Sequence, residues 1–133
     1  MNDLEEILDL FEEILNESKF KTKYYRVPRT DLDYQFGIEG YCNIQLFPVE
    51  GEEIAVRCFS STGINHITSE CLLKLIAYNY INEFGNFSLS NEGIIVFSHI
   101  LGFSTLRLNE LEMVIDRIAK GGQEAQKMLQ EEL

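Results

Sequence analysis

Histidine and cysteine are the residue types best suited to nucleophilic or metal chemistry, and this sequence contains few of them. There are two histidines, His66 and His99, and three cysteines, Cys42, Cys58 and Cys71. Cys58 and Cys71 flank His66 in the sequence, an arrangement that would suit a zinc site or a Cys–His nucleophile pair. However, the spacing matches no established zinc pattern, and the cysteines fall on apolar stripes, where cysteine behaves as a small hydrophobic residue. We therefore predict structural roles for these side chains, and no catalytic residue, metal or cofactor.

Paired carboxylates and glycine-containing turns are the other candidates for chemistry. Glu5/Glu6, Glu12/Glu13 and Glu131/Glu132 are adjacent acids, but acid–base catalysis needs two environments that separate the pKa values. These pairs fall on solvated helix faces or at the terminus, so we predict that they contribute to solubility. Thr62-Gly63-Ile64 and Gly121-Gly122-Gln123 lack the spacing and the lysine of a phosphate-binding loop.

Length and composition favour a single globular domain over residues 1–133. Of these residues 45% are hydrophobic and 25% charged, which is enough apolar material for a core. The 11 basic and 22 acidic residues give a net charge of −11, which argues against nucleic acids and anionic membranes as partners because both attract basic proteins. No apolar run approaches the ~18 residues of a membrane-spanning helix. The acidic start and the unpaired cysteines predict a cytoplasmic protein.

The first half of the sequence predicts a helix followed by an antiparallel meander. Apolar residues recur at helical spacing near the start, namely Leu4, Ile7, Leu8, Phe11, Ile14 and Leu15. Alternation of apolar and polar residues over 32–38, 41–47 and 54–58 predicts strands joined by turns at Gly40 and Gly51. In the first of these strands, Leu32, Tyr34, Phe36 and Ile38 are expected to point inward. Residues 24–27 would suit a further short strand.

The second half predicts a helix, two strands and a last helix. Thr68 is the expected N-cap of the first of these helices, and Gly85 is expected just past its end. Its predicted buried stripe comprises Leu72, Leu73, Ile76, Tyr80 and Phe84. Strands are predicted at 87–90 and 94–101, and the last helix is expected from residue 105 or 108 onward. Gly121 and Gly122 predict a kink or fraying beyond Lys120, because glycine costs roughly 1 kcal/mol relative to alanine inside a helix.

The strand predicted at residues 94–101 is apolar on both faces. One face carries Ile95, Phe97 and Leu101, and the other carries Ile94, Val96 and Ile100. Such a strand is expected to be covered on two sides, by this chain or by a second copy.

The element order α-β-β-β-α-β-β-α predicts an α+β two-layer sandwich with an antiparallel sheet. With this order over residues 2–130, the chain resembles the YbjN family, whose domain is similar in fold to the class I chaperones of type III secretion. Asn79-Tyr80-Ile81-Asn82 looks like that family's paired asparagines, and residues 87–96 look like its short hairpin. The basic, aromatic segment 20–29 departs from the family's pattern. The resemblance implies a non-catalytic domain that binds or protects other proteins, often as a homodimer.

Two features have competing interpretations. Asn79 and Asn82 share one helix face, where they would bond carbonyls of the adjoining hairpin or, alternatively, reach a partner strand. The basic stretch from Lys19 to Arg29 would neutralise the protein's own acidic helix, receive an acidic partner segment or contact RNA. We favour bonding within the chain for the asparagines and self-neutralisation for the basic stretch.

We therefore predict a non-enzymatic, chaperone-like module that captures an extended or amphipathic segment of another protein by strand-edge pairing and side-chain pockets. The predicted partner contacts are the aromatic residues Tyr41, Phe47 and Phe59 on the solvated face of the sheet, with Tyr24 and Arg26 beside them. The predicted homodimer contacts are Tyr80, Ile94, Val96 and Ile100. The alternative is an acidic immunity-like or regulatory inhibitor that covers a basic protein, for which association would depend strongly on salt. An enzyme is the third class.

Overall fold

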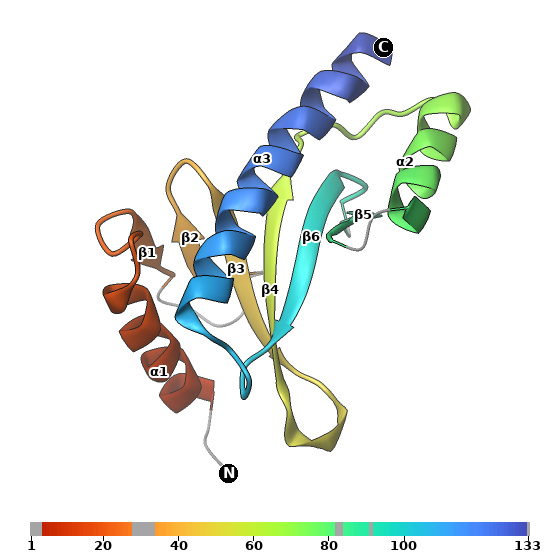
Figure 1. Ribbon diagram of the computed structural model, residues 1–133. Coiled ribbons are helices and arrows are strands. Elements are labelled where there is room, and N and C mark those ends of the chain that lie inside the picture. The colour runs from red at the N-terminus through yellow and green to blue at the C-terminus, as the bar shows by residue number, and fades with distance from the viewer. Residues whose placement is uncertain (1–3, 28–33, 82–83, 91, 133) are drawn as a thin grey trace.

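The elements follow the predicted order, with one strand more (Figure 1). The computed structural model describes residues 4–27, 34–81, 84–90 and 92–132. The described elements are α1 (Leu4–Glu17), β1 (Tyr24–Arg26), β2 (Phe36–Ile38), β3 (Cys42–Pro48), the 3-10 turn η1 (Glu50–Glu52), β4 (Ile54–Ser61), α2 (Ser69–Ile81), β5 (Asn86–Leu89), β6 (Ile95–Gly102) and α3 (Leu108–Glu132). The additional strand is β1, at the position where the sequence suggested a short strand.

The described strands form one antiparallel sheet in the order β1-β2-β3-β4-β6-β5. The predicted meander corresponds to β2, β3 and β4. β6 then inserts between β4 and β5, so β1 and β5 are the two edges of the sheet. The predicted α+β class with an antiparallel sheet is confirmed.

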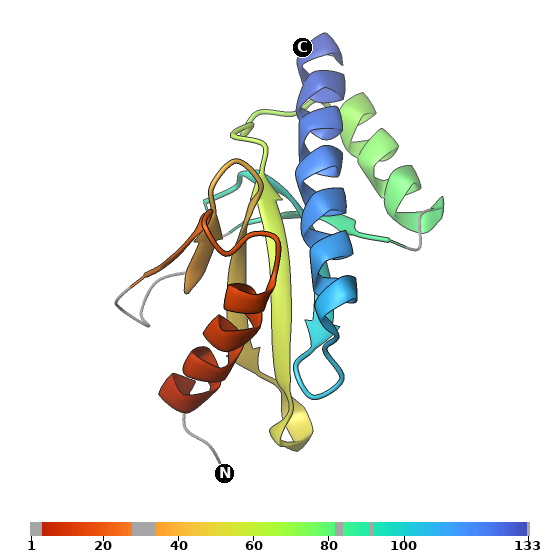
Figure 2. The same ribbon diagram turned by 60° about the vertical axis from the view of Figure 1, so that its left-hand side comes forward.

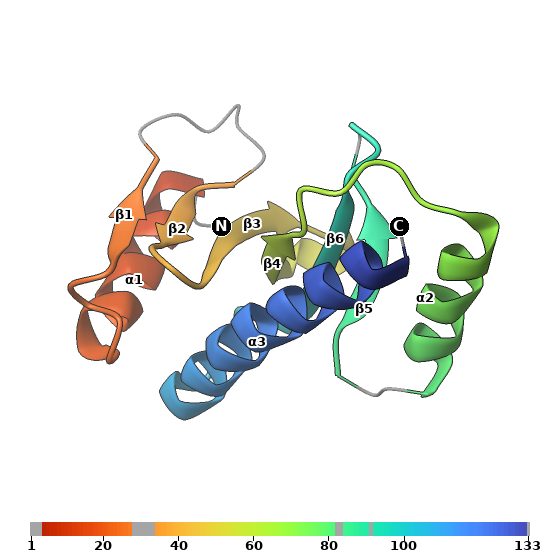
Figure 3. The ribbon, with the colours of Figure 1, turned by 90° about the horizontal axis from the view of Figure 1, so that it is seen from above.

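Helices α1 and α3 cover the same face of this sheet (Figures 2 and 3). The predicted stripe of α1 is buried at Ile7, Leu8, Phe11 and Leu15, and the Phe11 ring lies 5.2 Å from that of Phe36 in β2. Leu111, Val114, Ile115 and Ile118 of α3 complete this core against β3, β4 and β6. We call the covered side of the sheet the inner face and the opposite side the outer face.

Helix α3 runs through Gly121 and Gly122 without interruption, so the predicted kink or fraying is wrong. The structure shows why glycine stands there. A Cβ atom at Gly121 would lie 2.3 Å from the ring of Phe97, and one at Gly122 would lie 2.4 Å from Oγ of Ser60. The two glycines therefore bring the helix backbone close to β6 and β4, and tertiary packing outweighs their poor helix propensity.

The predicted inward placement of Tyr34 is also wrong, because the chain bulges before β2. Gln35 donates its N–H to the carbonyl of Ile44 at 3.0 Å, and Phe36 also pairs with Ile44. Two residues thus oppose one, as in a β-bulge. The buried Gln35 side chain accepts from the N–H of Leu46 at 2.7 Å, and the Tyr34 ring contacts Phe59 on the outer face. Leu32, predicted inward in the same strand, lies outside the described residues.

Helix α2 stands beyond β5 at the edge of the sheet and buries a different side from the one predicted (Figures 1 and 3). Its N-cap is confirmed, since Oγ1 of Thr68 accepts from the N–H of Cys71 at 3.1 Å. Cys71 and Leu75 are buried against Ile95 and Leu129. The predicted stripe is instead exposed at Leu72, Leu73, Ile76 and Tyr80, and Phe84 lies beyond the helix. No described helix is long and apolar enough to cross a bilayer.

Candidate protein-binding surfaces

The outer face carries none of the described helices, and its aromatic side chains are partly exposed. Phe47 of β3 lies under the guanidinium of Arg57 in β4, with 4.9 Å between the guanidinium carbon and the ring centroid. The rings of Phe59 and Tyr34 are 6.3 Å apart. Tyr25 lies across Gly37, where any Cβ atom would collide with its ring. In the described residues this face is thus an aromatic strip with the Arg57 guanidinium over one of its rings.

The structure places Phe47 and Phe59 on the outer face, as predicted, and adds Tyr25 and Tyr34, which sequence reasoning missed. Strand alternation over residues 24–26 places Tyr25 on the face opposite to Tyr24 and Arg26, so its position could have been predicted from the sequence. Tyr34 was not readable, because the bulge at Gln35 reverses the side on which it lies.

Arg26 lies on the inner face, where it holds α1 to β1. Its guanidinium donates to Asp9 at 2.6 Å, to Glu12 at 3.0 Å and to Glu5 at 2.8 Å. The hydrogen bond with Asp9 is the main cause that raises the pKa of Arg26, and burial opposes it. Self-neutralisation is thus confirmed for Arg26, which does not lie beside Phe47 as the sequence suggested; Arg29 is outside the described residues.

Tyr24 and Tyr41 also have partners within the chain, on α1 and in the turn after it. The Tyr24 hydroxyl donates to Glu12 at 2.9 Å and lies 2.6 Å from Oδ1 of Asn16. The Tyr41 ring packs edge-on against Phe20 with 4.9 Å between centroids. The predicted partner contacts therefore divide between the two faces, and only Phe47 and Phe59 lie together on the open one.

The two sheet edges differ in whether a further strand has access. At β5, the Asn79 amide donates to the carbonyl of Phe87 at 2.9 Å and accepts from its N–H at 2.7 Å, so the side chain occupies the place of a neighbouring strand. The interpretation of Asn79 as bonding the hairpin is confirmed; Asn82 lies outside the described residues. At β1, the bonds from Val27 to Gln35 and from Glu39 to Lys23 fix the register. In that register the backbone N–H and C=O groups of Tyr24 and Arg26 point away from β2.

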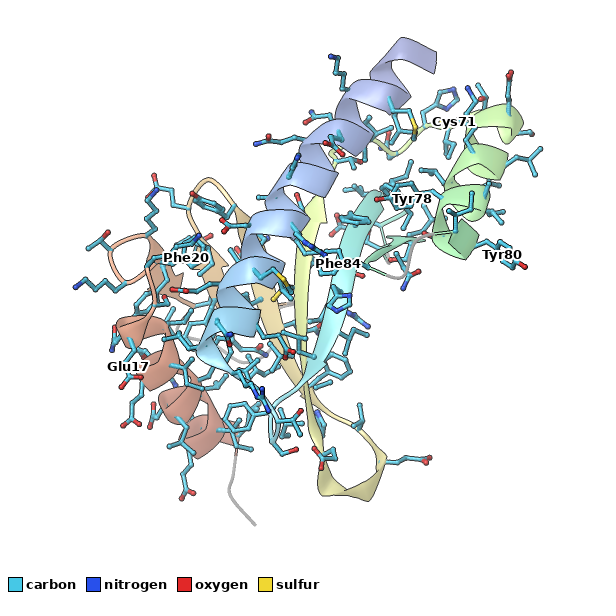
Figure 4. All side chains as sticks on the ribbon, viewed as in Figure 1. Glu17, Phe20, Cys71, Tyr78, Tyr80 and Phe84 are labelled. Carbon is cyan, nitrogen blue, oxygen red and sulfur yellow. The ribbon has the colours of Figure 1, made fainter. Side chains whose placement is uncertain are left out.

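A second apolar surface lies on α2, on the side remote from the sheet. We call it the α2 face; it comprises Leu72, Leu73, Ile76, Tyr80 and Ile81, which are between 45% and 92% exposed. Tyr80, at 92%, points away from the rest of the molecule (Figure 4). Monomeric proteins rarely leave such a contiguous apolar group in water.

Three of the predicted dimer contacts divide between these two surfaces, and the fourth, Ile94, lies just before β6. Tyr80 belongs to the α2 face. Val96 and Ile100 belong to the outer face, since they pair with Ser61 and Arg57 of β4. Ile100 is 51% exposed, and Ile94 and Val96 are partly buried. The strand is therefore covered on its inner face and open on its outer face.

The histidines and cysteines either pack within the fold or lie apart from one another. Cys58 and His99 are cross-strand partners in β4 and β6, but Cys58 is fully buried. The His99 ring stacks on Phe84 at 4.3 Å, and its Nδ1 accepts from the N–H of Gly85 at 3.2 Å. Burial lowers the pKa of His99, which favours the neutral imidazole that this bond requires, while the charge of Glu110 has the opposite effect. His66 is exposed in the connection before α2.

No protein-family model and no curated protein matches this chain. Among solved structures, its fold is similar to that of a chain of the heterodimeric ExoU–SpcU complex from the type III secretion system of Pseudomonas aeruginosa. The TM-score is 0.57 at 14% sequence identity, and the match covers 89% of this chain and 96% of the other. This likeness supports the predicted similarity in fold to type III secretion chaperones; membership of the YbjN family stays a prediction.

Proposed function

We propose that residues 1–133 form a single YbjN-like domain of the cytoplasm that binds a segment of another protein, without catalysis, in the manner of a chaperone. The observation that carries this proposal is the aromatic outer face, which no described helix covers and which ends at the open edge of β1. An extended segment would hydrogen-bond to the backbone of Tyr24 and Arg26, while its side chains contact Tyr25, Tyr34 and Phe59. The similar chain from ExoU–SpcU comes from a heterodimeric complex, which agrees with a protein as the partner.

We propose further that the protein is a homodimer in which a second copy covers the α2 face. Its exposed leucines, isoleucines and tyrosine form an apolar surface, and homodimer interfaces are apolar at their centre. The outer face is then left for the partner, so the two apolar surfaces have separate occupants.

An acidic inhibitor of a basic protein is the second candidate. It is favoured by α1, where Glu5 and Asp9 are 64% and 67% exposed although both pair with Arg26. Salt separates the two candidates, because binding through these carboxylates would weaken strongly as ionic strength rises, whereas capture on the outer face would change little.

Phe47→Asp tests the proposed function. Phe47 lies on the outer face under the Arg57 guanidinium, and a carboxylate there would have to lose its water when a partner segment covers it. We expect affinity capture from the native host to lose the partner at least about tenfold, while thermal unfolding stays cooperative. Leu10→Asp is the matched control, because it adds the same charge at an exposed apolar residue of α1. Equal capture by the wild type and Phe47→Asp would remove the outer face from the account.

A further inference from the structure

A hollow opens at one end of the outer face, where β4 separates from β3. Asn43 and Phe59 form the last described pair between these strands, while β4 continues beside β6 to the pair of Ser61 with Val96. The chain turns away at Gly40, which has a positive φ of 82°. The space left between the strands has a volume of about 400 Å³ and is open to solvent. It adjoins the proposed partner surface through Tyr25 and Phe59.

The lining of this hollow combines aromatic rings with a carboxylate. Tyr25 and Phe59 contribute rings from the outer face, and Glu39 is the charged residue among the described lining residues. Tyr41 also lines the hollow, but its ring packs against Phe20 and already has the Lys23 ammonium 5.2 Å from its centroid. Glu39 is exposed, and no ion pair within the described part of the chain involves it. Its charge acts on the wall of the hollow. The pKa of Tyr25 is raised mainly by a hydrogen bond with Tyr34 and by burial, and to a smaller extent by the charges of Tyr34 and Glu39.

Rings beside a carboxylate favour a cation as the occupant. A guanidinium stacks on aromatic faces and pairs with a carboxylate in the same plane. An anion would be repelled by Glu39 and by the net charge of −11. An apolar side chain would contact the rings but leave the Glu39 carboxylate unpaired.

Building on the proposed function, we propose that this hollow receives an arginine side chain of the captured segment. The guanidinium stacks between Tyr25 and Phe59 and pairs with Glu39, while the flanking residues of the segment lie along the outer face. The partner of this acidic protein is therefore an extended segment that carries arginine among its aliphatic residues.

The test uses two short capped peptides of alternating valine and threonine, one with arginine at its centre and one with citrulline, the uncharged isostere. Binding to the full chain is followed by NMR titration of the backbone amides. We expect the arginine peptide to bind about fivefold more tightly than the citrulline peptide, with the largest shifts at Tyr25, Glu39 and Phe59. In Glu39→Gln this ratio should fall to about twofold. Glu50→Gln, which removes the same charge at η1, at the far end of β3, should leave it unchanged.

Four outcomes would overturn the inference, and they bear differently on the proposed function. Equal affinities of both peptides, with shifts on the outer face, would exclude the arginine site and leave segment capture standing. A ratio that Glu39→Gln does not change would place the guanidinium elsewhere. Shifts confined to α1, or no binding of either peptide, would contradict the arginine site and count against capture on the outer face as well.

Discussion

Replacing both Leu73 and Ile76 with glutamate is expected to dissociate the homodimer. The two side chains are 66% and 55% exposed in a single copy, so the substitutions leave the core untouched. Covering each by a second copy would contribute about 1.5–3 kcal/mol, and the introduced carboxylates would have to be desolvated at the interface. The dissociation constant should therefore rise at least about 100-fold.

Light scattering in the micromolar range measures this change directly. The wild type should have twice the 15.4 kDa mass of one chain, and the double variant should have the mass of one chain. The matched control is Leu10→Glu with Met113→Glu, which adds the same charge at exposed apolar residues of α1 and α3. A wild type with the mass of a single chain would show that no second copy covers the α2 face.

Gly121→Val is expected to lower the free energy of unfolding by about 3 kcal/mol. Helix propensity alone predicts a small gain, because glycine is the poorer helix former. The loss comes from Phe97, which is 1% exposed and whose ring lies 2.3 Å from the position of the new Cβ atom. Gly85 also lies against this ring, since a Cβ atom at Gly85 would likewise be 2.3 Å from it, so the ring is closely packed.

Urea unfolding with matched variants separates this collision from other effects of valine. Gln123→Val places the same residue at an exposed position of α3 and should change the stability by less than about 0.5 kcal/mol. Combining Gly121→Val with Phe97→Leu should cost at least about 1 kcal/mol less than the sum of the single variants. Additive losses would mean that Phe97 is not the residue against which α3 packs here.

Local patterns predicted much of the fold. The apolar spacing of α1, the alternation of the meander and the Thr68 cap are each set by nearby residues, and each is found in the structure. Gly121 and Gly122 were misread because the reason for glycine there is the distance to Phe97 and Ser60, which are remote in the sequence. A one-residue bulge at Gln35 likewise depends on pairing with β3 and leaves no periodic signal.

The candidate surfaces were harder to predict than the elements. Helix α2 is apolar on two sides, and periodicity gives no means of choosing between Cys71 with Leu75 and the larger residues of the α2 face. The tertiary structure decides, because the short strand β5 and the end of α3 leave room for only one of these sides. Arg26 was likewise expected on the outer face, because periodicity did not show which face α1 covers. Its three carboxylate partners were nevertheless visible in the sequence as an acidic helix.

Photo-crosslinking in the native host tests most directly whether the outer face is where this protein meets its partner. p-Benzoylphenylalanine in place of Phe59 puts a reactive ring on the outer face, and the same residue in place of Leu10 puts one on exposed α1. The account predicts a covalent adduct with a second protein from position 59 and none from position 10. Adducts from position 10 alone would contradict it and would favour the acidic surface of α1 as the binding site.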